Sequence, residues 1–357
     1  MKIKFLQAFN GDAILITIKD ETINRNVLID GGHGNTYSQK SRGRIKYNDL
    51  FQELKLIKEN GERIDLLILT HVDDDHIGGI LKWIETDKDA LDLVRKVWFN
   101  SGRTIKKLFE TDCDIEYDNS IELNRSSSTD TSIAQGVKFE DFLKSQPGIW
   151  DEKIIKTGDE ISIYGLDFKI LSPDEDRLKD LLGKWTKEEP DSLDTSGHKD
   201  DYKKTLAQHI QDDTFEEDTS KHNGSSISFI LSFDGKNYLF LADSFPNVVV
   251  SSMKALGCSE HDPLKCEFVK VAHHGSKANN NNELLRLIDS NKYVISTNGA
   301  KHSHPNKQFL ARLINQKNDC EIYFNYPDLA KAIFSLQDKS DFPDFRIYET
   351  SQLKTTI

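Results

Sequence analysis

Short apolar segments separated by polar turns fill the first hundred residues, and they predict alternating strands and helices. Residues 13–18 and 26–30 are β-branched runs bounded by turn residues, as expected for strands. Residues 64–69 form a mostly apolar run, typical of a strand buried on both faces. Apolar residues recur at helical spacing over 50–57 and 77–84, which predicts one helix on each side of that strand.

The same rhythm returns after residue 223. The stretch from 226 to 242 predicts a hairpin that turns at Asp234-Gly235, a favoured pair for a tight turn. Residues 268–272 and 293–296 predict two further strands. Apolar spacing predicts helices near residues 284–288 and 309–314. The two halves therefore have similar organisation.

The stretch between the halves, residues 101–222, is more polar. Residues 184–221 contain few large apolar residues and more acidic residues than lysines, so they cannot bury much core. We predict a single domain over residues 1–357, with 101–222 as an insertion that is either a solvated loop or a lid. A hairpin pattern at 159–171 is the exception within it.

Composition limits the possible partners and the compartment. The formal net charge of −12 over 357 residues argues against a long, evenly basic nucleic-acid groove. The four cysteines form no CxxC pair, which predicts reduced thiols in a cytoplasmic protein. Neither a signal-peptide pattern nor an apolar window of about 18 residues is present, so no membrane association is expected.

The loop that follows strand 64–69 is dense in metal-ligand residue types. His71, Asp73, Asp74, Asp75 and His76 lie within six consecutive residues, and Gly78-Gly79 follows. His71 and Asp73 can face one metal ion, and Asp75 and His76 can face a second. Two ions about 3.5–4 Å apart can hold a hydroxide between them and stabilise both the attacking and the leaving oxygen.

Four more predicted strands end in similar residues. They end at Asp30-Gly31-Gly32, at Asp243-Ser244, at His273-His274-Gly275-Ser276, and at Ser296 with His304-Pro305 shortly after. Rigid strand ends along one sheet edge aim side chains at a common point. Asp243 could then reach the loop from the far sheet and bridge two metal ions.

These motifs resemble those of the metallo-β-lactamase superfamily. Within it, the chain is most similar to the branch that contains the hydrolase domain of the ComEC competence proteins and the phosphorylcholine esterases. The branch resemblance rests on Gly11-Asp12-Ala13, on the HxDxDH order of the ligand loop, and on His273-His274-Gly275-Ser276. It covers residues 1–100 and 223–306 and implies an α+β (α/β) fold, the four-layer αββα sandwich, with a long polar insertion.

The resemblance also implies a ligand set for two divalent metal ions. Asp30 would orient the ligand loop by hydrogen bonds, and either His222 or Asn223 would fill the third-motif position. Of the adjacent histidines we favour His274 as a ligand and His273 as a neighbour, although the reverse remains open. The metal ligands we predict are His71, Asp73, Asp75, His76, His222, Asp243 and His274.

Asp73 stands where the commoner superfamily pattern has histidine. A carboxylate is a harder ligand than imidazole, so Mn²⁺ or Mg²⁺ becomes a candidate beside Zn²⁺. The branch implies phosphoester chemistry, with Asp75, His273 and His304 as candidate catalytic residues. Ser276 and Lys277 are candidates for binding a substrate phosphate.

Three hypotheses about function follow. The first is a metal-dependent phosphodiesterase or nuclease that uses a metal-bridging hydroxide. The second is a hydrolase of a small phosphodiester, a lactam or a thioester, and the third is a non-catalytic metal-binding partner subunit. The basic segment 103–107 is either a nucleic-acid contact or a charged helix face.

Overall fold

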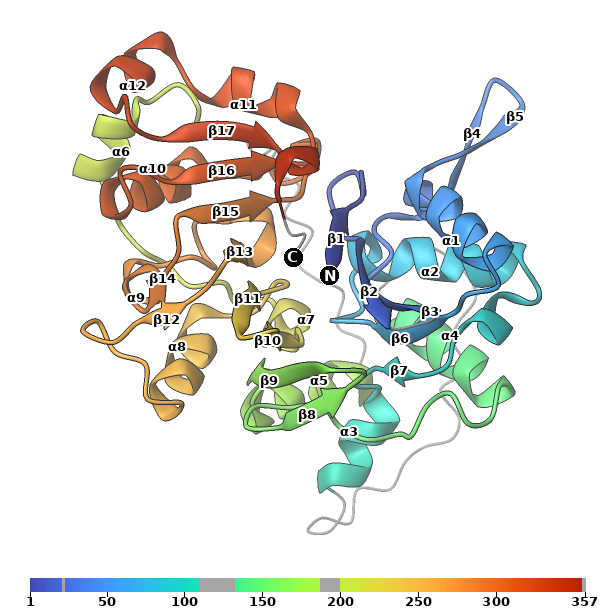
Figure 1. The fold of residues 1–357 in the computed structure, drawn as a ribbon. Helices are drawn as coiled ribbons and strands as arrows, with labels where there is room; N and C mark the ends of the chain where they lie inside the picture. The colour runs from blue at the N-terminus through green and yellow to red at the C-terminus, as the bar shows by residue number, and fades with distance from the viewer. Residues whose placement is uncertain (21–22, 110–131, 187–199, 355–357) are drawn as a thin grey trace.

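The computed structural model describes residues 1–20, 23–109, 132–186 and 200–354. Two sheets face each other, and helices cover their outer faces (Figure 1). This arrangement confirms the predicted four-layer αββα sandwich.

The first sheet has five strands and the second has eight. In spatial order the first sheet contains β1 (Lys2–Phe5), β2 (Ile14–Asp20), β3 (Ile23–Ile29), β6 (Ile64–Ile68) and β7 (Val97–Trp98). The second contains β17 (Arg346–Glu349), β16 (Glu321–Phe324), β15 (Lys292–Ile295), β13 (Phe268–Lys270), β11 (Lys236–Phe240), β10 (Ser228–Phe233), β9 (Leu166–Ser172) and β8 (Glu160–Ile163). Two small ribbons pair β4 (Ser38–Ser41) with β5 (Arg44–Tyr47), and β12 (Leu264–Lys265) with β14 (Ile288–Asp289).

The helices flank the sheets in chain order. Those of the first half and the central stretch are α1 (Asp49–Glu59), α2 (Asp74–Thr86), α3 (Gly102–Phe109), α4 (Ser132–Ser145), α5 (Glu175–Thr186), α6 (Leu206–Gln211) and α7 (Lys221–Gly224). Those of the second half are α8 (Pro246–Ala255), α9 (Asn282–Arg286), α10 (Lys307–Gln316), α11 (Pro327–Ile333) and α12 (Leu336–Asp341). Short 3₁₀ turns are η1 (Gly34–Thr36), η2 (Ala90–Leu93), η3 (Ala272–Gly275) and η4 (Thr350–Gln352). Among the described helices, none has the length and apolar character that crossing a bilayer requires.

Side chains alternate between the two faces of each sheet, as a pleated strand requires. In β6, Leu66 and Ile68 pack between the sheets, whereas Leu67 packs under the helices of the first half. In β11, Phe240 faces the first sheet and Leu239 faces the helices of the second half. The interior therefore contains one layer between the sheets and one layer under each set of helices.

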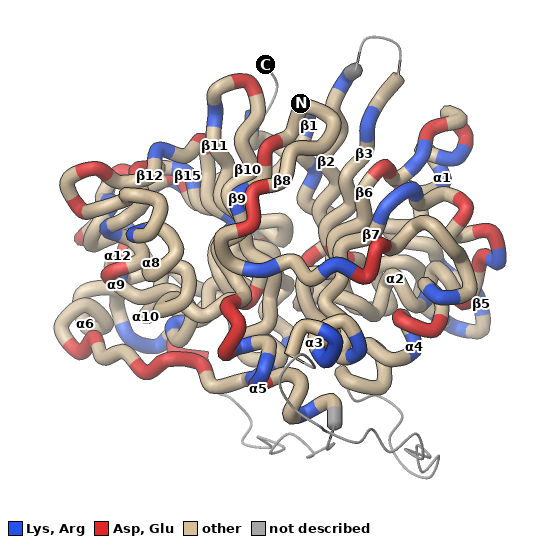
Figure 2. The backbone as a smooth tube through the Cα atoms, turned by 90° about the horizontal axis from the view of Figure 1, so that it is seen from below, with Lys and Arg blue, Asp and Glu red and all other residues tan. Residues whose placement is uncertain are grey.

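Several parts of the stretch 101–222 belong to the sheets and helices of the fold. The predicted hairpin at 159–171 is β8–β9, and β9 pairs with β10 to extend the second sheet. Residues 200–221 are mostly exposed but are tied to the second half, because Asp201 accepts hydrogen bonds from the backbone N–H groups of Lys307 and Gln308 and so caps α10. The acidic segment that follows α6 is visible in Figure 2. Residues 187–199 lie outside the described residues.

Asp338 links three elements of the second half. Its carboxylate pairs with the buried Lys307 at 2.6 Å and accepts the backbone N–H of Leu206 at 2.6 Å. Asp338→Ala is expected to lower the free energy of unfolding by about 3–5 kcal/mol, because it leaves a buried ammonium unpaired. Urea denaturation measures this. Lys331→Ala, which breaks the exposed pair with Asp328, should leave the free energy of unfolding almost unchanged; equal effects would contradict the prediction.

Candidate metal centre

The ends of parallel strands meet at one edge of the sandwich. β3 and β6 run parallel in the first sheet, and β11, β13 and β15 run parallel in the second. The segments that follow their carboxyl ends carry Asp30, the ligand loop, Asp243 and the histidine pair. A backbone hydrogen bond from Ile227 N–H to the Thr70 carbonyl joins the two halves beside this edge.

Asp243 lies at the centre of this cluster, with its two carboxylate oxygens facing different groups. Its Oδ1 is 3.5 Å from Nε2 of His76 and 3.7 Å from Nε2 of His274. Its Oδ2 is 3.8 Å from Nε2 of His71 and 3.6 Å from Nε2 of His273. One carboxylate therefore touches two sets of imidazoles.

These separations fit shared metal ions better than hydrogen bonds. Donor atoms about 2.1 Å from one tetrahedral ion lie roughly 3.4 Å apart, whereas N–H···O bonds are about 2.9 Å long. Within the described residues, Nε2 of His71, His76 and His274 and Oδ1 of Asp243 are buried without a hydrogen-bond partner. Donor atoms of the set Asp75, His76 and His274 all lie within 4.8 Å of one another, as do those of His71, His76 and Asp243. The residues present therefore fit divalent metal ions.

The two remaining carboxylates of the ligand loop are held by neighbours. Oδ1 of Asp73 lies 3.0 Å from Nδ1 of His222 and accepts the hydroxyl of Ser132 at 2.6 Å, while its Oδ2 faces His71 at 3.7 Å. Oδ2 of Asp75 accepts a hydrogen bond from Nδ2 of Asn10 at 2.9 Å. His222 therefore reaches the cluster through Asp73.

Asp74 points elsewhere. Its Oδ2 lies 3.3 Å from Nε2 of His33, and its Oδ1 accepts a hydrogen bond from Nε2 of Gln135 at 2.8 Å. It therefore ties the ligand loop to η1 and α4 and offers nothing to the cluster around Asp243.

Two carboxylates lie behind the imidazoles of His76 and His274. Oδ2 of Asp30 lies 2.7 Å from Nδ1 of His76, and Asp30 also accepts the backbone N–H and the hydroxyl of Thr70. This is the orienting role that the sequence predicted for Asp30. Oδ1 of Asp12 lies 3.4 Å from Nδ1 of His274, and its Oδ2 pairs with the buried Lys270 at 2.6 Å. The sequence assigned no role to Asp12 or Lys270.

Charge pairing in the cluster is strong. Burial alone would lower the pKa of His76, but the carboxylates of Asp243 and Asp30 outweigh it and raise that pKa well above its usual value. Burial would raise the pKa of Asp243, but the imidazoles of His273, His76 and His274 hold it well below its usual value. A divalent ion would replace the protons that these imidazoles share, so metal binding should release protons.

Left-handed backbone conformations gather at the same strand ends. Asp30 has φ 56°, Ala242 φ 44°, His273 φ 45° and His274 φ 53°. Such conformations cost roughly 1–3 kcal/mol each in residues with side chains, and they cluster at functional sites. The fold therefore holds the backbone in these unfavourable conformations at the positions that direct the side chains towards the cluster.

His273 and His304 lie beside the cluster. Nδ1 of His273 lies 3.0 Å from Oδ1 of Asn279 and 3.4 Å from Asp218, and Asp218 accepts Nδ2 of Asn223 at 2.6 Å. The rings of His273 and His304 are 4.8 Å apart. Burial and the neighbouring His273 lower the pKa of His304 well below its usual value.

The two predicted phosphate contacts differ in exposure. The hydroxyl of the buried Ser276 accepts the backbone N–H of Ala278, whereas the Lys277 side chain is exposed. The basic segment 103–107 is partly neutralised, because Arg103 pairs with Glu140. Lys107 pairs with Glu152.

Outside the cluster, the imidazoles of His33 and His209 have partners of their own. The polar sequence around His33, His198, His209 and His261 predicts surface positions for all four. This prediction is wrong for His209, which is buried with its Nε2 2.8 Å from the Asp201 carbonyl oxygen. A polar backbone group inside a predicted loop gives that imidazole a partner, and local sequence does not reveal it. His198 lies outside the described residues.

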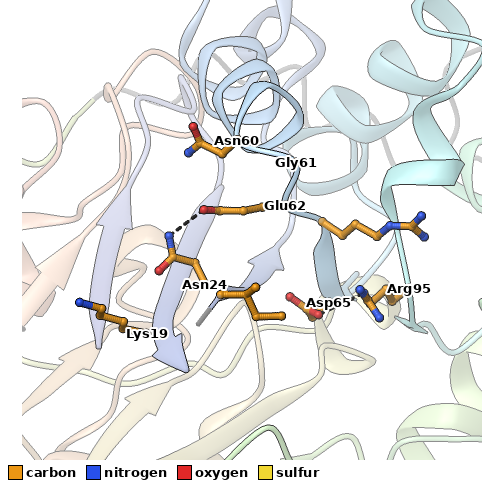
Figure 3. Close-up of a pocket in the computed structure, with 9 residues that line it drawn as sticks. Lys19, Asn24, Asn60, Gly61, Glu62, Asp65 and Arg95 are labelled. Carbon is orange, nitrogen blue, oxygen red and sulfur yellow. Dashed lines mark hydrogen bonds and ion pairs between the residues drawn. The ribbon is translucent and has the colours of Figure 1, made fainter. Parts of the chain in front are cut away.

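A separate pocket opens at the opposite end of β6 (Figure 3). Its carboxylates already have partners. Glu62 accepts Nδ2 of Asn24 at 2.7 Å, and Asp65 pairs with Arg25 at 3.1 Å and with Arg95 at 3.3 Å. Because the ligand loop follows the carboxyl end of β6, this pocket is not part of the metal cluster.

Comparison with known proteins agrees with this geometry. Residues 6–142 match the family model described as the metallo-beta-lactamase superfamily, whose members are metal-dependent hydrolases. No curated protein matches the sequence. The matched residues include Asp30 and the whole ligand loop, and the cluster beside them has His and Asp groups able to hold metal ions.

Solved structures with a similar arrangement are distant in sequence. The metallo-beta-lactamase fold protein YhfI from Bacillus subtilis has 9% identity and a TM-score of 0.42, with 97% of this chain and 95% of that chain covered. A metallo-beta-lactamase from Staphylococcus aureus has 14% identity and a TM-score of 0.33, with 98% and 97% covered. One from Cronobacter sakazakii has 12% identity and a TM-score of 0.30, and only 67% of this chain and 59% of that chain are covered. These likenesses carry no information about substrate.

Asp12→Asn is expected to weaken metal binding by about 10–100-fold, the usual effect of removing a partner that orients a ligand histidine. The reason is that Nδ1 of His274 would lose the carboxylate behind it. Titration calorimetry with Mn²⁺ measures the effect. Asp65→Asn is a matched control, because Asp65 is equally buried and paired with arginine but lies in the separate pocket. Equal losses in both variants would refute an orienting role.

Proposed function

We propose that this chain is a metal-dependent phosphodiesterase that holds two divalent ions and acts on nucleic acid. In this proposal His71, Asp73 and Asp243 would hold one ion. Asp75, His76, His274 and Asp243 would hold the other. The distances around Asp243 support this division, because each of its oxygens faces its own set of donors.

The observation that carries the proposal is the share of carboxylates among the donors. Asp73, Asp75 and Asp243 supply oxygens beside imidazoles, and hard oxygen donors suit Mn²⁺ and Mg²⁺ as well as Zn²⁺. When bound, such ions act as Lewis acids on phosphoryl oxygens and lower the pKa of water. A phosphodiester brings the anionic oxygens that this charge would stabilise.

Residues of the chain itself would orient the imidazoles and protonate the leaving oxygen. Asp30 and Asp12 would hold the rings of His76 and His274 in place. His273 and His304 lie side by side at the cluster, and the carboxylates of Asp243 and Asp218, which outweigh burial and raise the pKa of His273, favour His273 over His304 as the group that would protonate the leaving oxygen. Lys277, exposed just past the histidine pair, is available to a substrate phosphate.

A small phosphodiester is the second candidate substrate. The formal net charge of −12 favours it, because a strongly acidic surface repels a long polyanion. The two candidates differ in what the protein cleaves rather than in the metal cluster.

The test offers one protein preparation several substrates. Protein loaded with Mn²⁺, Zn²⁺ or Mg²⁺ would receive single- and double-stranded DNA, RNA, bis-p-nitrophenyl phosphate and nitrocefin. The doubly substituted Asp75→Ala/His76→Ala protein serves as the control for contaminating nucleases. Cleavage of nucleic acid that this control lacks would support the proposal.

Other outcomes would replace it. Turnover of the small diester alone would favour the second candidate, and turnover of nitrocefin alone would point to a lactam. Metal binding without turnover of any substrate would favour a non-catalytic metal-binding subunit.

A further inference from the structure

A free-standing ribbon carries an unusual concentration of positive charge. The strands β4 and β5 pair only with each other and project from the first half beside α1 (Figure 1). The ribbon contains Lys40, Arg42, Arg44 and Lys46 and no acidic residue. Within the part of the chain that the structure describes, these four side chains form no ion pair, and all four are exposed. This differs sharply from a chain whose formal net charge is −12.

The residue at the first central position of the turn at the tip of the ribbon is not the one that this type of turn favours. Ser41 pairs with Arg44, and both Arg42 at φ 48° and Gly43 at φ 78° are left-handed, which defines a two-residue turn of the I′ type. Asparagine or glycine is the relaxed choice at the first of these positions. Turn geometry therefore gives no reason for an arginine there.

Aromatic packing fixes the base of the ribbon. The rings of Tyr47 and Phe51 stack with centroids 3.9 Å apart, and Tyr37 contacts the edge of Phe51 at 5.5 Å. Beyond this base, Ile45 is 63% exposed. An isolated two-stranded ribbon is at best marginally stable in water, so this one extends into solvent without a protein surface to support its outer part.

The base also lies next to the ligand loop. The turn η1, which leads directly into the ribbon, packs on α2, and a Cβ on Gly78 would lie 2.8 Å from the Gly34 nitrogen. His33, just before η1, contacts Asp74 of the ligand loop. Strands of four residues extend the ribbon by roughly 13 Å from this base. A polyanion that reaches the base of the ribbon would therefore lie beside the ligand loop.

We infer that the ribbon β4–β5 is an arm that binds the phosphate backbone of double-stranded nucleic acid and directs it to the metal centre. Arg44 and Lys46 share one face of the ribbon, Lys40 lies on the other and Arg42 lies at the tip, and a two-stranded ribbon fits the width of a duplex major groove. This inference names the substrate of the proposed phosphodiesterase and rests on that proposal for its purpose. It also resolves the conflict with the acidic net charge, because binding needs only a local basic arm.

The test measures binding without catalysis. Fluorescence anisotropy of a short labelled DNA duplex would be followed in EDTA over a series of salt concentrations. The ribbon variant is Lys40→Gln/Arg42→Gln/Arg44→Gln/Lys46→Gln. The control, Lys2→Gln/Lys88→Gln/Lys265→Gln/Lys339→Gln, removes the same charge from other exposed, unpaired lysines of the described chain.

The ribbon variant is expected to bind the duplex at least about tenfold more weakly than the control. The slope of log K against log salt should become shallower by about 3–4, one unit per lost phosphate contact. Thermal unfolding checks that both variants fold. As a second variant, Arg42→Gly relaxes the turn, should not lower the melting temperature, and should cost about one unit of slope.

Equal loss in the ribbon and control variants, or loss in neither, would overturn the inference. Loss of binding to phosphatidylserine vesicles with no binding to DNA would identify a membrane surface instead. Because no metal is present, failure of the ribbon to bind is distinguishable from failure of the proposed catalysis. Metal-loaded protein that binds the duplex through the ribbon yet cleaves nothing would refute only the proposed function.

Discussion

Replacing Asp243 by alanine is expected to remove both metal ions and with them the hydrolysis of phosphodiesters. Each carboxylate oxygen of Asp243 faces a different set of donor atoms. The single substitution would therefore remove the carboxylate that both sets share. Removing a partner of a ligand already costs about 10–100-fold in metal affinity, and a shared ligand should cost more. Titration calorimetry and turnover of bis-p-nitrophenyl phosphate measure the two losses.

The control for this experiment is Glu62→Gln. Glu62 hydrogen-bonds Asn24 in the separate pocket, away from the cluster, so its removal should leave metal binding intact. If Asp243→Ala lost only one ion and retained the other at normal affinity, Asp243 would not be shared. If it lost neither, the cluster would not be a metal centre.

Gly11→Ala is expected to have the second large effect. A Cβ at this position would overlap the carbonyl oxygen of Asp75, which is backbone and cannot rotate away. The loop of residues 10–12 would separate from the ligand loop, and the hydrogen bond from Asp12 N–H to the Asp75 carbonyl would break. We expect about 3 kcal/mol of destabilisation, the upper end for overpacking, together with weaker metal binding.

Gly183→Ala provides the matched control. Gly183 lies exposed in α5, and an added Cβ would meet nothing within 4 Å. It should stabilise the protein by about 0.5–1 kcal/mol, because alanine favours helix. Urea denaturation and Mn²⁺ titration of both variants test the comparison. A Gly11→Ala protein as stable and as metal-competent as Gly183→Ala would show that the two loops can separate freely.

The residues that gather around Asp243 could be predicted from the sequence because residue type and position agree there. Asp30, the ligand loop, Asp243 and His274 each follow an apolar strand, and parallel strands bring their carboxyl ends to one edge. The pattern of strands in the sequence therefore predicts that these residues meet at one edge of the sandwich, even though it does not show which strands are neighbours.

The residues behind the ligands could not be found in the same way. Asp12 and Lys270 are 258 positions apart, and only tertiary structure brings them together. One signal was available, since Lys270 interrupts the apolar strand Val269-Lys270-Val271. A buried ammonium requires a carboxylate partner, so such a lysine predicts a buried acid somewhere in the chain.

Other elements were missed for different reasons. The ribbon β4–β5 is exposed on nearly every side, so it lacks the apolar alternation that marks a half-buried strand. Residues 200–221 looked solvated by composition, yet Asp201 and Asp213 hold α10 through its N-terminus and through Arg312. Acidic residues used as caps and ion-pair partners cannot be told from solvated ones by composition alone.

The most direct test of the account is the metal content of the purified wild-type protein. Inductively coupled plasma mass spectrometry after loading with Mn²⁺ or Zn²⁺ and removal of free metal gives ions per chain. Asp243 with its two sets of donors predicts two ions per chain, and none in Asp243→Ala. A wild-type content of one ion or none would contradict the dinuclear centre on which the proposed chemistry depends.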